Sequence, residues 1–181
     1  MKKLSFKHTA HWLIFTLANL LIMFAACSKD SDNNDDNLKY GTVTLNREKK
    51  KITRAEYRNA GGGDYLLLLY LNNSNNERVE LHLNKDNHMK GNTIVLTQKD
   101  TSTKGWHWIV EYYDSSDSGI ITAGGKDDPL QFKSGTLTIS APPESGKDIT
   151  ILLNNGKVIG TDGNTEYTLT FNYSGKMKEV E

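Results

Sequence analysis

Residues 167–173 read Tyr-Thr-Leu-Thr-Phe-Asn-Tyr, and this stretch decides the fold class of the chain. Large apolar or aromatic side chains occupy every second position, with threonine or asparagine between them. Successive side chains of a β-strand point to opposite faces, so this spacing predicts a strand with one buried and one solvated face. Such one-sided strands are typical of antiparallel sheets.

The same alternation recurs in segments that lie N-terminal to this stretch. They are residues 42–45, 79–84, 93–97, 106–113, 136–140 and 149–153. Residues 65–71 are apolar throughout, which predicts a central strand that is covered on both faces. Residues 49–59 suit a strand or a short helix that ends at the glycines 61–63, and we expect a strand.

Turn-forming residues separate these segments at regular spacing. Asn155-Gly156 is the strongest hairpin signal and predicts a two-residue turn between strands at 149–153 and 157–160. Residues 61–63, three consecutive glycines, lack the lysine and hydroxyl residue of a phosphate-binding loop and predict a wide turn. The sequence therefore predicts an all-β fold, an antiparallel β-sandwich or partly open barrel of about ten short strands.

The N-terminus has the parts of a secretory signal. Three lysines lie within the first seven residues, an apolar run covers residues 12–24, and Ala25 and Ala26 precede Cys27. The run is shorter than the roughly 20 residues of a transmembrane helix. Residues 24–27, Phe-Ala-Ala-Cys, resemble the lipobox of bacterial lipoproteins. The resemblance implies a signal peptide at residues 1–26 and lipid attachment at Cys27, and the alternative is an ordinary signal with an unrelated cysteine.

Residues 28–37 contain four aspartates among serines and asparagines, and no apolar residue. Such a segment cannot bury enough surface to fold, so residues 27–37 are expected to form a disordered acidic tether. The pattern resembles the acidic export signal of surface lipoproteins of the Bacteroidetes, and a plain linker is the alternative. This resemblance implies an outer-membrane protein that is lipid-anchored and faces the cell exterior.

Residues 38–181 are expected to form a single all-β domain. The signal and the tether together carry four basic and four acidic residues of the chain's 22 and 22, which leaves the domain with 18 of each. A neutral domain lacks the basic excess of nucleic-acid-binding proteins. If Cys27 carries a lipid, the domain has no thiol for a disulfide bond or a metal.

Residues 134–139, 148–160 and 167–175, together with the lipobox and the tether, resemble small all-β lipoproteins of gut-type Bacteroidetes, most of which are uncharacterised. The shared motifs are strand and turn patterns, so they imply architecture and no catalytic residue. The Gly-x-Trp start of lipocalin-like relatives is missing after the tether, and no ligand cavity is carried over.

Few residues indicate chemistry. His82, His88 and His107 share no ligand spacing and are expected to face solvent, so no metal site is predicted. No catalytic residue and no cofactor is predicted. Trp106 and Trp108 are in phase with the apolar positions of their predicted strand, which favours the core, and the alternative is a ligand-binding platform.

The sequence therefore predicts a lipid-anchored outer-membrane protein whose β-sandwich is a non-catalytic binding or structural module. One alternative is a glycan-binding accessory protein of a polysaccharide-uptake system, and others are a hydrolase on a β scaffold and a fimbrial subunit. The expected partners are the membrane, through the lipid on Cys27, and a polysaccharide or an envelope protein, but no nucleic acid.

Overall fold

The computed structural model describes residues 41–181. The predicted signal peptide, the lipid on Cys27 and the tether lie outside the described residues. The elements are β1 (Thr42–Leu45), β2 (Glu48–Gly61), β3 (Asp64–Leu71), β4 (Arg78–Asn84), α2 (Lys85–His88), β5 (Thr93–Val95), β6 (Ile109–Tyr113), β7 (Gly119–Gly124), β8 (Phe132–Ile139), β9 (Asp148–Ile159), β10 (Glu166–Lys176) and β11 (Lys178–Glu179). In this part of the chain, no helix has the length and apolar character that crossing a membrane requires.

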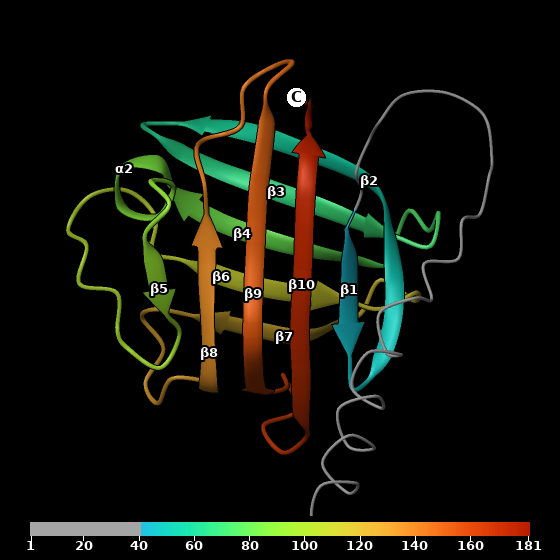
Figure 1. Cartoon of the computed structure of the whole chain (residues 1–181). Coiled ribbons are helices and arrows are strands. Elements are labelled where there is room, and N and C mark those ends of the chain that lie inside the picture. The colour runs from blue at the N-terminus through green and yellow to red at the C-terminus, as the bar shows by residue number, and fades with distance from the viewer. Residues whose placement is uncertain (1–40) are drawn as a thin grey trace, which may run out of the picture. The chain divides into compact units, whose positions relative to one another are not determined.

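The strands form one sheet that curls over itself. Their order is β5-β8-β9-β10-β1-β2-β3-β4-β6-β7, with β11 paired to β2 off this path. Figure 1 shows two crossed layers: a front layer of β8, β9, β10 and β1, and a back layer of β3, β4, β6 and β7, with β2 bending from one to the other. The predicted all-β antiparallel fold is confirmed, as a curled half-barrel.

Alternation along the strands builds the core between the two layers. Leu169, Phe171 and Tyr173 of β10 are at most 3% exposed and belong to the same hydrophobic cluster as Leu67 and Leu69 of β3. Burial of apolar surface of this kind is the main favourable contribution to folding. The pattern of residues 167–173 thus fixes which face of β10 enters the core.

The inner face of β3 is buried, whereas its outer face is only partly covered, because Leu66 and Tyr70 are half-buried. The predicted cover on both faces therefore holds only around Leu68. Leu67 and Leu69 have no exposed surface, and Leu68 between them is only 7% exposed. The strand pairs with β2 on one side and β4 on the other. Its central position in the sheet is therefore confirmed.

Strand β2 makes the corner between the layers. Its first residues pair with β1, and from Ile52 onward it pairs with β3, with a register shift between Ile52 and Arg54. The edge of β2 that does not pair with β3 is covered first by β1 and then by β11, which pairs in parallel with Glu56 and Tyr57. The predicted strand at residues 49–59 is confirmed, and it is longer than expected.

Hydrogen bonds join β7, at one end of the strand order, to the segment that follows β9. The backbone N–H of Thr161, just after β9, donates to the carbonyl of Ile120 in β7 (3.1 Å), and the Thr161 hydroxyl donates to the carbonyl of Gly119 (2.9 Å). The half-barrel is closed at this corner.

The predicted hairpin at Asn155-Gly156 is wrong. Strand β9 continues through both residues, and Asn155, with φ 52°, lies in a bulge opposite β10. A Cβ on Gly156 would lie 2.5 Å from the carbonyl oxygen of Leu169, so glycine is needed for the close approach of β10. The dipeptide bends one long strand instead of reversing the chain.

Candidate binding site

The two tryptophans of the predicted platform lie in different environments. Both precede β6, which begins at Ile109, so the strand predicted over residues 106–113 is shorter than expected. Trp108 is 2% exposed and packs edge-on against Phe132, with ring centres 6.1 Å apart. A ring this deeply buried belongs to the core, although Trp108 also borders the cavity described next.

Trp106 lies at the surface and is only half-buried. Its ring is 5.4 Å from the imidazole of His82 on β4. The two side chains border a cavity of about 400 Å³, whose other walls include His107, Lys126 and Asp127. We call this the Trp106 cavity, and it lies between the loop before β6 and the loop after β7.

Two aspartates hold the loop that carries Trp106. The Asp64 carboxylate at the start of β3 accepts the backbone N–H of Trp106 and the side-chain amide of Asn84, both at 2.8 Å. Asp100 accepts the backbone N–H of Trp108 at 3.2 Å. The loop is therefore anchored on both sides of the cavity-lining residues.

Asp100 is also the centre of a buried polar cluster. Its carboxylate accepts a hydrogen bond from His88 Nε2 (2.9 Å), and His107 Nδ1 lies 3.5 Å away. Burial would raise the pKa of Asp100, but hydrogen bonds from Ser102, His88 and Trp108 outweigh it and lower the pKa. The cluster places the carboxylate at its centre, whereas a catalytic triad needs histidine between serine and acid.

His88 is only 3% exposed, so the expectation of a solvent-facing side chain is wrong. Its Nδ1 accepts the backbone N–H of Asn84 (2.9 Å), which leaves Nε2 to donate to Asp100. Both ring nitrogens are thus satisfied in the neutral form. Burial lowers the pKa of His88, against the opposing effect of Asp100.

One face of the back layer is turned away from the core, and we call it the outer face. It carries an ordered row of side chains. Cross-strand pairing aligns Glu56, Leu68, Glu80, Glu111 and Thr122 across β2, β3, β4, β6 and β7. Glu80 and Glu111 are direct neighbours. Like charges in that position destabilise a sheet unless other groups compensate them.

A neighbouring row on the outer face alternates cations and aromatic rings. The guanidinium of Arg54 lies 3.8 Å from the ring centre of Tyr70, and that of Arg78 lies 4.1 Å from the ring centre of Tyr113. Arg78 also pairs with Asp117 at 2.5 Å. The guanidinium groups therefore stack on the rings of Tyr70 and Tyr113. Trp106 is the aromatic residue of the outer face that borders the cavity.

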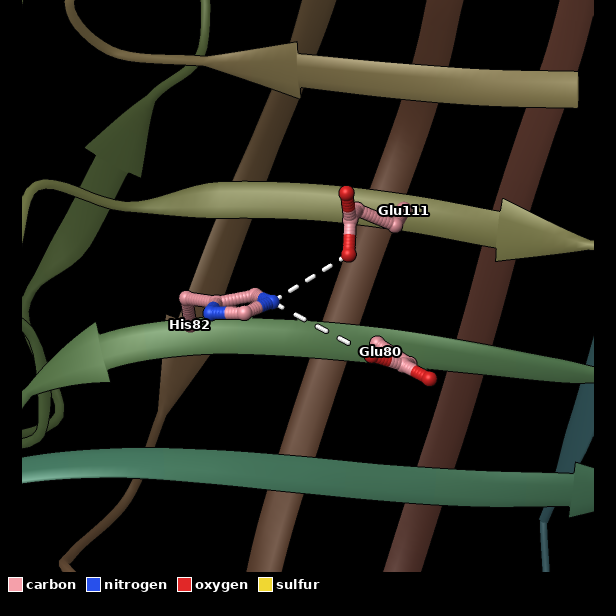
Figure 2. A group of neighbouring side chains, drawn as sticks. All are labelled: Glu80, His82 and Glu111. Atoms are coloured by element: carbon pink, nitrogen blue, oxygen red, sulfur yellow. Dashed lines mark hydrogen bonds and ion pairs between the residues drawn. The ribbon is translucent and has the colours of Figure 1, made fainter. Parts of the chain in front are cut away.

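Glu80, His82 and Glu111 form a compact group at the centre of the outer face, and Figure 2 shows their side chains turned toward one another. His82 Nε2 lies 3.2 Å from Glu111 Oε2 and 4.0 Å from Glu80 Oε2. The other oxygens have partners, because Arg78 donates to Glu80 Oε1 (2.5 Å) and Thr122 lies 3.4 Å from Glu111 Oε1. The hydrogen bond from His82 lowers the pKa of Glu111, against burial, which would raise it.

Within the described residues, this is the group of histidine and carboxylate side chains whose ligand atoms all lie within 4.8 Å of one another, close enough to share a metal ion. The sequence places Glu80 and His82 on one face of one strand, two residues apart. Glu111 was missed because only the pairing of β4 with β6 brings it beside them. His88 and His107 both lie against Asp100, away from this group.

Comparison of the chain with protein-family models, with curated proteins and with solved structures found no match.

Proposed function

We propose that the chain is a lipid-anchored protein of the bacterial outer membrane, held through Cys27, whose β domain is a non-catalytic binding module. The anchor rests on the lipobox-like residues 24–27 and on the acidic segment that follows them. The binding role rests on one observation, the Trp106 cavity.

The cavity has the character of a small binding site. It combines an accessible aromatic ring with a cationic and an anionic side chain, Lys126 and Asp127. Sites of this kind use an apolar wall for contact area and a few polar groups for orientation. The loop that carries Trp106 is fixed by Asp64 and Asp100, so little order has to be gained on binding.

A polysaccharide is the ligand class that the half-buried indole favours. The apolar face of a sugar ring can lie on an aromatic ring, while the hydroxyl groups at its edge need polar partners. An envelope protein is the other candidate partner. No observation favours the hydrolase, because Glu80 and Glu111 do not line the cavity and both are engaged by neighbouring side chains.

A glycan array probed with the domain of residues 38–181 tests the ligand class. We expect binding to a polysaccharide, and we expect Trp106→Ala to weaken it by at least about 2 kcal/mol, roughly thirtyfold in Kd. Tyr70→Ala is the matched control, since this ring lies on the same outer face but not in the cavity. Equal losses in the two variants, or no glycan bound by the folded domain, would contradict the polysaccharide assignment.

Fatty-acid labelling in a bacterial host tests the anchor. We expect the chain to incorporate labelled palmitate and to fractionate with the outer membrane. The Cys27→Ser variant should lose the label and leave the membrane fraction, because a lipid chain contributes about 0.8 kcal/mol for each buried CH₂ group. Membrane association that survives Cys27→Ser would refute the anchor.

A further inference from the structure

We propose that Glu80, His82 and Glu111 form a binding site for one divalent transition-metal ion of the zinc class. The site lies on the outer face and links β4 to β6. It is independent of the ligand of the Trp106 cavity, although His82 borders both.

The geometry matches the size of such an ion. One imidazole nitrogen and one oxygen from each carboxylate lie within 4.8 Å of one another. Zinc holds nitrogen and oxygen ligands at about 2.0–2.2 Å, so two ligands of a tetrahedral ion lie roughly 3.3–3.6 Å apart. His82 Nε2 lies 3.2 Å from Glu111 Oε2, which is close to this separation, and 4.0 Å from Glu80 Oε2, so the Glu80 carboxylate would move inward by roughly half an ångström.

The outer oxygens of both carboxylates are held by neighbours. Arg78 binds Glu80 Oε1 and Thr122 lies beside Glu111 Oε1, while Oε2 of each residue faces His82. Metal ligands in proteins are commonly oriented by such secondary hydrogen bonds. Binding an ion would therefore keep these outer hydrogen bonds and replace the contact of His82 Nε2 with Glu111 Oε2.

The local charge is not balanced by the protein. With a neutral His82, Glu80, Glu111 and Asp117 carry three negative charges around the guanidinium of Arg78, which leaves two. A divalent cation between Glu80 and Glu111 removes that excess. It also relieves the repulsion between two glutamates that are direct cross-strand neighbours.

The ligand types select the class of metal. Imidazole suits zinc, copper, nickel and iron, whereas calcium requires six to eight oxygen ligands and magnesium a nearly octahedral oxygen shell. Three protein ligands leave one position of a four-coordinate zinc ion open. The open position is available to water or to an atom of a bound molecule.

Calorimetric titration with zinc chloride tests the site in the full chain. Cys27→Ala serves as the parent, because Cys27 is the only cysteine and would bind zinc itself. We expect one site in the parent that His82→Gln and Glu111→Gln weaken at least about tenfold. Glu56→Gln is the matched control, since Glu56 is in the same cross-strand row but separated from the site by Leu68, and its binding should be unchanged.

Zinc binding that is equal in all four proteins would overturn the proposal and would assign the ion to groups elsewhere, such as His8 and His11. Binding of calcium but not zinc would also overturn it.

A second measurement leaves Glu80, His82 and Glu111 unchanged, in case a variant of these residues fails to fold. Cobalt(II) bound at His82 would lie beside the Trp106 ring, whose centre is 5.4 Å from the imidazole, and should quench its fluorescence with one equivalent. Trp106→Phe should lose that response while still binding the ion. Cobalt that binds without quenching would place the metal elsewhere.

Discussion

Replacing each tryptophan of the domain by alanine separates the core ring from the surface ring. Trp108 is 2% exposed and packs against Phe132, so Trp108→Ala removes a large buried side chain and leaves a cavity. Substitutions of this kind lower the free energy of unfolding by about 3–5 kcal/mol. Trp106 is half-buried and rests on His82 at one side of an open cavity, so Trp106→Ala should cost less than about 1 kcal/mol.

Urea denaturation followed by far-UV circular dichroism measures the difference without relying on tryptophan emission. With a slope of about 2 kcal/mol per molar urea, the midpoint should fall by about 2 M for Trp108→Ala and by less than about 0.5 M for Trp106→Ala. If Trp108→Ala is too unstable to fold, Trp108→Phe should show a smaller loss in the same direction. Similar midpoints for the two alanine variants would refute the assignment of Trp106 to the surface and of Trp108 to the core.

Three further experiments, two of them with a matched control variant, test the packing and the buried histidine. Tyr112→Phe removes a hydroxyl that donates to a buried carboxylate at 2.8 Å, so it should lower the free energy of unfolding in urea by about 1.5–3 kcal/mol. Tyr113→Phe is the control and should change it little, because that hydroxyl has only a 3.5 Å contact. Gly156→Ala should lower the free energy of unfolding by about 1–3 kcal/mol, because the added Cβ would lie 2.5 Å from a backbone atom. Gly119→Ala is the control and should be nearly neutral, since its Cβ would have no contact shorter than 3.4 Å. Equal costs for the two variants would argue against the bulge at Gly156. Burial lowers the pKa of His88 below the value of about 6.5 that it has in the unfolded chain. On acidification the unfolded chain therefore takes up the proton first. The free energy of unfolding should fall as the pH drops from about 7 to about 5. Thermal melts of His88→Gln should show a flatter decline, and an unchanged decline would contradict this role.

The strands were predictable because their alternation records which face is buried. Leu169, Phe171 and Tyr173 specify the inner face of β10 without reference to any other strand. The turn at Asn155-Gly156 failed because its signal is local, and the pairing of Gly156 with Leu169 of β10 overrides it. A dipeptide that favours reversal can equally make a bulge when a long partner strand continues past it.

The site was less predictable, since its parts come from distant segments. Trp106 is in phase with β6 but is turned out of the strand by Asp64, which lies 42 residues earlier in the chain. Glu80 and His82 share a face by alternation alone, whereas Glu111 joins them through a strand pairing that spans α2 and β5. Neither the hydrogen bond from Trp106 to Asp64 nor the pairing of β4 with β6 can be recognised from the local sequence.

Strand β1 determines how the domain would respond to mechanical force. The chain enters the domain at Gly41, which passes so close to β10 that a Cβ there would lie 1.5 Å from the carbonyl oxygen of Asn172. Strand β1, which follows, is paired along both edges, through four residue pairs with β2 and four with β10. A pull from a membrane anchor would run along β1 and load these pairs together in shear, whereas a pull on an edge strand breaks them one after another. Because forced unfolding is governed by the unfolding rate, a domain loaded through the proposed anchor is expected to stay folded under drag for longer than its equilibrium stability alone implies.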